Sequence, residues 1–185
     1  MAIDAKAVEG YIPGTWKLDP VHTDISFTVR HMMVSKVRGK FTDFEGTIVT
    51  AENPEESTVS FEAKMNSIDT GNPDRDNHLR SQDFFEAEKY PTMTFKSTGV
   101  KKAGDGFALD GDLTIHGVTK PVTLAFDVNG FAKDPYGGTR AGFSATGEIN
   151  RKDFDISISM PMDGGGVVVG DKINIHLEVE AILES

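Results

Sequence analysis

The stretch ISFTVRH, residues 25–31, alternates apolar and polar residues without a break, and it decides the fold. Successive side chains of a β-strand point to opposite faces, so this pattern predicts a strand with one buried and one solvated face. The same alternation recurs along most of the chain, at residues 59–65, 107–115, 122–128, 143–149 and 173–181. The sequence therefore predicts an all-β protein.

Short stretches rich in Gly, Pro, Asn and Asp separate these strands and predict chain reversals. Links of hairpin length favour antiparallel neighbours, because a parallel pair needs a long crossover. We count eight or nine strands, and so large a sheet leaves two bare edges unless it closes. The sequence therefore predicts an up-and-down antiparallel barrel. Between Phe41 and Phe44 the apolar parity switches, which predicts a β-bulge or a sharp bend there.

One segment departs from the strand pattern and predicts a short helix over residues 73–82. Asn72 suits the N-cap and Pro73 the first helical position. Within this helix, Arg75, His78 and Leu79 share one face, at helical spacing.

Length and composition favour one globular domain. The chain has 185 residues, so we expect a flexible arm over residues 1–14 and a single barrel domain over residues 15–185.

The absence of cysteine excludes disulfides, thiolate metal sites and cysteine nucleophiles. The net charge of −10 speaks against nucleic acid as a partner and against an anionic membrane surface.

The sequence also bears on membrane and compartment. No stretch approaches the ~18 consecutive apolar residues that a bilayer crossing needs, so we expect no stable membrane insertion. The N-terminus lacks a basic region followed by an apolar one. We therefore expect no secretory signal and a cytoplasmic protein.

No motif of metal or nucleotide chemistry is present. The five histidines show no His-x-His, His-x-x-x-His or His-Glu-x-x-His spacing, so we predict no metal site. His116 and His176 fall on the polar faces of their strands and are expected to be solvated or to make hydrogen bonds at the surface. His31 has inward parity, which fits a hydrogen-bonded core histidine and a polar point on a cavity wall equally well. The glycines at 164–166 precede a β-type run rather than a helix, which indicates a turn and not a phosphate loop. We predict no catalytic residue and no cofactor.

Whether the barrel is hollow stays open at this point. Its predicted inward positions mix large apolar residues with Ala63, Gly111, Ala145, Gly147 and Ala181. Small residues leave room for a hydrocarbon guest, but alternation of small and large residues also fits a packed, tapered core. If the barrel is hollow, parity places seven candidate ligand-binding residues on the tunnel wall: Phe27, Val29, Phe41, Phe61, Phe95, Leu113 and Ile115.

Several blocks of sequence follow one another in a recognisable order. They are WKLDPVH at 16–22, ISFTVRHMM at 25–33, VRGKF at 37–41, RDNHL at 75–79, GDLTIHGVTKPV at 111–122 and NRKDF at 150–154. Over about residues 15 to 183 the chain resembles the YceI-like family of bacterial polyisoprenoid-binding proteins. The resemblance implies an extended, eight-stranded, lipocalin-like barrel with an amphiphilic isoprenoid in a central tunnel. It also places the helix of residues 73–82, with Leu79, beside the mouth.

Three functions follow from these observations. The first is binding, with transport or sequestration, of a polyprenyl or quinone-like lipid whose polar head contacts His31, Arg75 and His78. The second is a packed barrel that interacts with another protein. The third is an enzyme on a small apolar substrate, with His31 or His78 as general base. The sequence leaves a homodimer open, and the resemblance links some family members to the periplasm and to stress protection.

Overall fold

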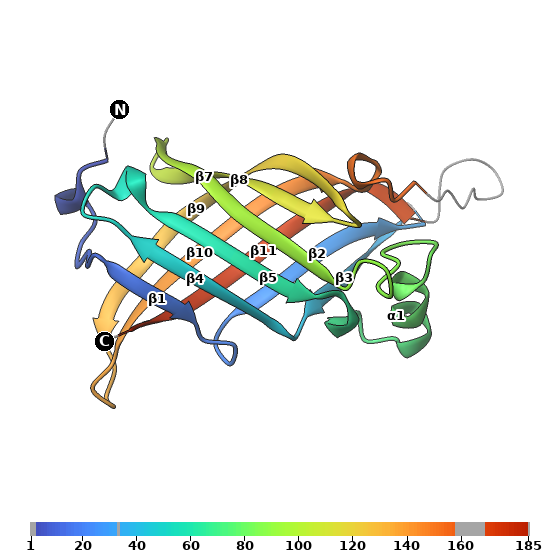
Figure 1. Cartoon of the computed structure of the whole chain (residues 1–185), viewed down its shortest axis with the longest axis horizontal. Helices are drawn as coiled ribbons and strands as arrows, with labels where there is room; N and C mark the ends of the chain where they lie inside the picture. Colours follow the sequence, from blue (N-terminus) through green and yellow to red (C-terminus); the bar gives the residue numbers. More distant parts are fainter. Residues whose placement is uncertain (1–2, 33, 158–168, 185) are drawn as a thin grey trace.

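The chain forms one closed antiparallel barrel (Figure 1). Its structure, a computed structural model, describes residues 3–32, 34–157 and 169–184. In this part of the chain the strands are β1 (Gly14–Leu18), β2 (Asp24–His31), β3 (Ser35–Phe41), β4 (Phe44–Thr50), β5 (Thr58–Lys64), β6 (Ile68–Asp69), β7 (Thr92–Ala103), β8 (Gly106–Ile115), β9 (Val118–Lys133), β10 (Thr139–Asn150) and β11 (Val169–Leu183). The helices are η1 (Ala5–Ala7), η2 (Pro54–Glu56), η3 (Met65–Ser67), α1 (Pro73–Arg80) and η4 (Arg151–Phe154).

The eleven strands of the described residues occupy eight strand positions around the barrel. Both β1 and β2 pair with β11, β1 near the end of β11 and β2 nearer its start, so together they form one long, bent strand. In the same way β3 pairs with β2 while β4 pairs with β1, so β3 and β4 share the next position, and β6 and β5 share the one after it. Strands β7 to β11 then follow in chain order, and β11 returns to β1. The predicted eight-stranded, up-and-down antiparallel barrel is confirmed.

The predicted bend between Phe41 and Phe44 is also present, because β3 ends at the first residue and β4 begins at the second. Backbone bonds hold the interruption: the Thr42 N–H donates to the Ser67 carbonyl at 3.3 Å, and Lys64 donates to the carbonyl of Asp43 at 2.9 Å. The slip in register lets Phe41 and Phe44 both pack against the core, although they are three residues apart.

Helix α1 begins where the sequence predicts, because the Asn72 side chain accepts the N–H groups of Asp74 and Arg75. It ends at Arg80, two residues before the predicted end. There Ser81 donates both its N–H and its hydroxyl to the carbonyl of His78, which closes the last turn. Among the described helices, none combines the length and the apolar character that a bilayer crossing requires.

Two apolar clusters hold the barrel. The larger fills its interior, and the smaller lies where β1 meets β10 and β11, around Trp16, Ala141 and Ala181. Trp16 is fully buried, and its indole N–H donates to Thr50 Oγ1 at 2.9 Å. Burial of an indole needs such a partner, and here the Trp–Thr pair joins β1 to β4 beside the β1–β11 pairing that closes the sheet.

The N-terminal segment lies across the end of the barrel opposite α1 (Figure 1). Ile3 is buried, and its N–H donates to Glu55 Oε2 at 3.2 Å. The Tyr11 hydroxyl donates to the carbonyl of Ala51 at 2.5 Å, and burial raises its pKa above the ordinary value. The segment predicted as a flexible arm is docked on the barrel in the structure, and β1 begins at Gly14, the last residue of that segment.

Candidate ligand-binding tunnel

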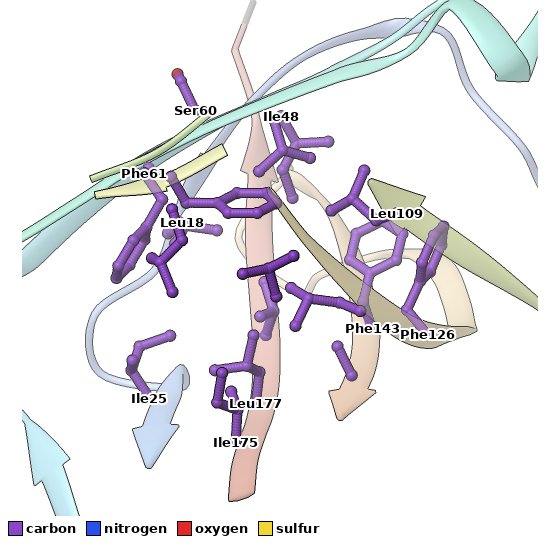
Figure 2. A pocket seen from close by; sticks show the side chains of 18 of the residues that line it. Leu18, Ile25, Ile48, Ser60, Phe61, Leu109, Phe126, Phe143, Ile175 and Leu177 are labelled. Carbon is purple, nitrogen blue, oxygen red and sulfur yellow. The ribbon is translucent and has the colours of Figure 1, made fainter. Parts of the chain in front are cut away.

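An apolar cavity of about 260 Å³ lies inside the barrel. Figure 2 shows Leu18, Ile25, Phe61, Leu109 and Leu177 around the same space, although they come from different strands. An apolar cavity of about 150 Å³ stays dry and holds a benzene molecule, so this one has room for a larger hydrocarbon.

The polar side chains along the wall do little to make it polar. Ser26 donates to the carbonyl of His176 at 3.1 Å and to Asp24 Oδ2 at 3.0 Å. Thr50 donates to the carbonyl of Ile12 at 2.7 Å. Hydroxyls that are already bonded to the protein offer little to a guest. The cavity therefore selects for apolar shape along most of its length.

Of the seven predicted wall residues, six line the cavity. They are Phe27, Phe41, Phe61, Phe95, Leu113 and Ile115. Val29 does not belong to the lining, although it shares a face with Phe27. It lies two residues further toward the tip of the β2–β3 hairpin, so correct parity does not bring it to the cavity.

The residues predicted to meet a polar head lie elsewhere. His31 ends β2 opposite Ser35 and does not line the cavity. Arg75 donates through Nε to Thr70 Oγ1 and through Nη2 to the Thr70 carbonyl, both at 2.7 Å. Both residues are therefore outside the lining, and Arg75 serves to hold α1 to the segment before it.

His78 and Leu79 also stay outside the cavity lining. His78 Nε2 lies 2.8 Å from Asp83 Oδ2, and its ring meets Phe84 edge-on with centroids 5.0 Å apart. Leu79 packs against the large core cluster. Helix α1 thus lies at one end of the barrel with this face turned to the core and to the loop that follows it. Contact of these residues with a ligand stays a prediction.

Sequence reasoning missed Arg151 as a wall residue. It is only 3% exposed, and among the described residues it is the only charged one on the lining. Its guanidinium donates to the carbonyls of Gly170 and Ile156, at 3.1 and 2.8 Å, and lies 3.1 Å from Asp171. Period-two alternation counted from Phe143 reaches residue 151, but β10 ends at Asn150 and Arg151 begins η4, so the pattern alone does not give the direction of this side chain.

The N-terminal wall residues show no such alternation. Ile3, Val8 and Tyr11 line the cavity at its far end, but their spacing follows neither a strand nor a helix. The glycines at 164–166 lie outside the described residues, so their predicted turn is not addressed.

His116 was predicted to be solvated or to make hydrogen bonds at the surface; it makes a hydrogen bond, but with its side chain largely buried. Its side chain is 14% exposed, and Nδ1 lies 3.0 Å from the carbonyl of Phe154. Strand β8 ends at Ile115, and His116 occupies the following turn with φ of +57°, so the parity of the strand no longer decides its direction. The imidazole instead ties this turn to η4.

A second polar cluster lies at the bend between β1 and β2, outside the cavity lining. His22 Nδ1 is 2.7 Å from Asp19 Oδ2 and 3.3 Å from Glu180 Oε2. The hydrogen bond from His22, with that from Arg140, lowers the pKa of Asp19 to about 2, and the same bond to Asp19 raises the pKa of His22.

The ligand atoms of Asp19, His22 and Glu180 lie within 4.8 Å of one another, close enough to hold a cation. However, Arg140 Nη1 already lies 2.7 Å from Asp19 Oδ2 and 2.8 Å from Glu180 Oε2. A guanidinium thus neutralises these carboxylates, and the cluster is best understood as an ion network that fixes the bend.

Known proteins share both the sequence and the fold of this barrel. A family model described as a YceI-like domain matches residues 16–181. A UPF0312 protein of Photorhabdus laumondii and Protein YceI of Escherichia coli O157:H7 are each 46% identical over 140 residues, which is 75% of this chain and 73% of each relative.

Solved structures agree with the family match. The YCEI protein of Campylobacter jejuni is 34% identical, with a TM-score of 0.72 over 96% of this chain and all of that one. BcnA of Burkholderia cenocepacia (22% identical, TM-score 0.74, covering 88% of this chain and 98% of that one) shares the fold. So does a polyisoprenoid binding domain of Saccharophagus degradans (14%, 0.67, 94% and 100%). On its sequence match and its closed barrel, the chain belongs to the YceI-like family.

Proposed function

We propose that this barrel binds an amphiphilic isoprenoid lipid, of polyprenyl or quinone-like type, and carries or sequesters it. The observation that carries the proposal is the apolar cavity inside the closed sheet. The solved domain of Saccharophagus degradans that shares the fold is described as polyisoprenoid-binding, which supports the choice of ligand class. A hollow interior also favours binding inside the barrel over a role as a packed interaction module.

The energetics suit a long apolar ligand. Burial of each CH₂ contributes roughly 0.8 kcal/mol, so one five-carbon unit contributes about 3 to 4 kcal/mol. Binding costs about 4–15 kcal/mol in lost translation, rotation and ordering. A few isoprene units therefore suffice for stable binding with few polar contacts.

Arg151 is our candidate for contact with the polar head. A guanidinium carries five N–H donors, and the described contacts of Arg151 are two carbonyls and one carboxylate. The remaining hydrogens can serve an oxygen at the cavity end where Arg151 lies. We also infer that the protein binds its ligand without transforming it, since neither His31 nor His78 lines the cavity.

The direct experiment is native mass spectrometry of the purified protein, followed by organic extraction of whatever it holds. We expect a bound species with the mass of an isoprenoid, or uptake of added farnesol or a short-chain ubiquinone by empty protein. An empty protein that takes up neither compound contradicts the proposal.

A filled cavity gives a second test. Ala145 lines the cavity, whereas its neighbour Thr146 alternates to the other face. We expect Ala145→Phe to reduce farnesol affinity at least tenfold and Thr146→Phe to leave it nearly unchanged. Thermal unfolding of both variants checks that each still folds. Equal affinity of the two folded variants would place the ligand outside the cavity.

A further inference from the structure

The β2–β3 hairpin concentrates positive charge in an acidic chain. Residues 30–40 contain Arg30, Lys36, Arg38 and Lys40 and no Asp or Glu. The whole chain carries −10, so the remainder carries −14. All four side chains are exposed, and the register of the hairpin places them on its outer face.

The stability of the fold does not explain why these four positive charges lie together. Arg30 lies directly opposite Lys36, and like charges in such a cross-strand pair are destabilising. Among the described residues, the one carboxylate within 4.0 Å of these four cations is Asp24, 3.8 Å from Arg38. Three of the cations are thus left to solvent or to an external anion.

The tip of the hairpin is apolar. His31 and Ser35 form its last pair, so Met32 and Val34 lie outside the paired strands, at the tip. Val34 is 86% exposed and Met32 is 41% exposed. Met32 has φ of +53°, a conformation in which Gly, Asn or Asp is usual. Two apolar side chains thus stand exposed beside the four cations, and such a combination suits the interface of a membrane.

The hairpin also stands beside one end of the cavity. It lies at the same end of the barrel as α1 (Figure 1). Gly170 is the link: its carbonyl accepts the Nε–H of Arg151, and a Cβ built on it would lie 3.3 Å from Arg30 Cβ. The cavity wall at Arg151 and the cationic face at Arg30 are therefore neighbours.

We propose that the β2–β3 hairpin docks the barrel on the surface of an anionic phospholipid bilayer. Lys and Arg side chains are drawn to such a surface, and apolar residues between them enter the interface. From the net charge of the whole chain we expect repulsion by anionic membranes, but the excess of negative charge lies outside the hairpin. The acidic remainder orients the molecule with the hairpin toward the lipid, and it keeps the contact reversible. This proposal rests on the proposed function only for its purpose, the loading or release of lipid.

The test is sedimentation of the protein with vesicles of phosphatidylcholine, with and without phosphatidylglycerol. We expect binding to the anionic vesicles at low salt and at least tenfold weaker binding to pure phosphatidylcholine. Raising the ionic strength to about 1 M shortens the screening length to roughly 3 Å, and the binding should then be lost.

A matched pair of variants localises the contact. Removal of one cation near the surface weakens binding roughly fivefold, so Arg30→Gln with Lys36→Gln should weaken it about 25-fold. Lys6→Gln with Lys133→Gln changes the net charge equally and should have little effect, because η1 and the end of β9, to which these residues belong, lie at the other end of the barrel from α1 (Figure 1). Val34→Ser should weaken vesicle binding several-fold without any change in charge.

Three results would overturn the docking proposal: no vesicle binding, equal loss in both double variants, or hairpin-dependent binding to polyglutamate but not to vesicles. Uptake of farnesol in solution is measured separately on the same proteins. Vesicle binding without uptake contradicts the proposed function alone, and uptake without vesicle binding contradicts the docking alone.

Discussion

Gly111 illustrates how single residues shape the cavity. It lies in β8 beside the ring of Phe95, and a Cβ there would collide with that ring and lie 2.8 Å from the carbonyl oxygen of Lys96. A small residue at an inward position therefore makes room for a neighbouring aromatic ring, and only part of that room remains as cavity.

This contact predicts the effect of Gly111→Ala. The added methyl overpacks a wall that has no free space, so we expect a loss of about 1–3 kcal/mol of unfolding free energy in urea titrations. Gly99→Ala is the control, because nothing lies within 4 Å of a Cβ at that position. Equal losses in the two variants would mean that the Phe95 contact is not the cause.

Asp19 predicts a pH dependence of stability. Its folded pKa of about 2 lies below the ordinary 3.8, so its contribution is present above about pH 4 and is lost as the pH falls toward 2. We expect Asp19→Asn to lower the unfolding free energy at pH 7 by about 1–2 kcal/mol and the difference to vanish near pH 2.

Urea titrations from pH 2 to pH 8 measure the unfolding free energies of the wild type and of Asp19→Asn. Asp105→Asn, at an exposed turn, is the control. The partner His22 behaves in the opposite sense. Because the pKa of His22 is raised, its contribution to the unfolding free energy is fully present below pH 6.5 and is lost as the pH rises through the raised pKa. A gap between wild type and Asp19→Asn that stays constant down to pH 2 would contradict the ion network.

Among the elements, the strands were predictable and the parts that close the ends were not. Period-two alternation depends only on which face of a strand is buried, so it located β2, β5, β8 and the bend after Phe41. Where alternation stops, as at His116, or never starts, as at Ile3 and Tyr11, the direction of a side chain depends on contacts with distant segments. Such contacts leave no local pattern, and for the same reason α1 was found but its partners were not.

The N-terminal segment predicts a change in ligand release. Tyr11→Phe keeps the ring against Phe131 but removes the hydroxyl that donates to the Ala51 carbonyl. The N-terminal segment should then be held on the barrel by about 1 kcal/mol less. If the ligand leaves past this segment, release should become roughly fivefold faster, since ~1 kcal/mol corresponds to that ratio.

Stopped-flow displacement of a fluorescent isoprenoid analogue measures the rate. Tyr136→Phe is the matched control, because Tyr136 is 91% exposed. An unchanged rate in Tyr11→Phe would assign release to the end that carries α1 and the β2–β3 hairpin.

On the scale of the whole molecule, the barrel limits how much hydrocarbon it can bury. A cavity of about 150 Å³ holds the six carbons of benzene, so about 260 Å³ corresponds to roughly ten carbons, or two isoprene units. A longer chain must either move the wall or leave its remaining units in water. Closed sheets resist such expansion, because every strand is hydrogen-bonded on both sides.

Affinity should therefore rise steeply with chain length and then level off. From a five-carbon to a ten-carbon isoprenoid alcohol we expect a gain of up to about 3 to 4 kcal/mol, and beyond ten carbons a much smaller gain for each unit. Calorimetric titration of prenol, geraniol, farnesol and geranylgeraniol measures the series. In Ala145→Phe the plateau should begin one unit earlier, because the added ring occupies the same space. A constant gain through twenty carbons would show that the barrel opens to its ligand, and the resting cavity would then not set the length that it carries.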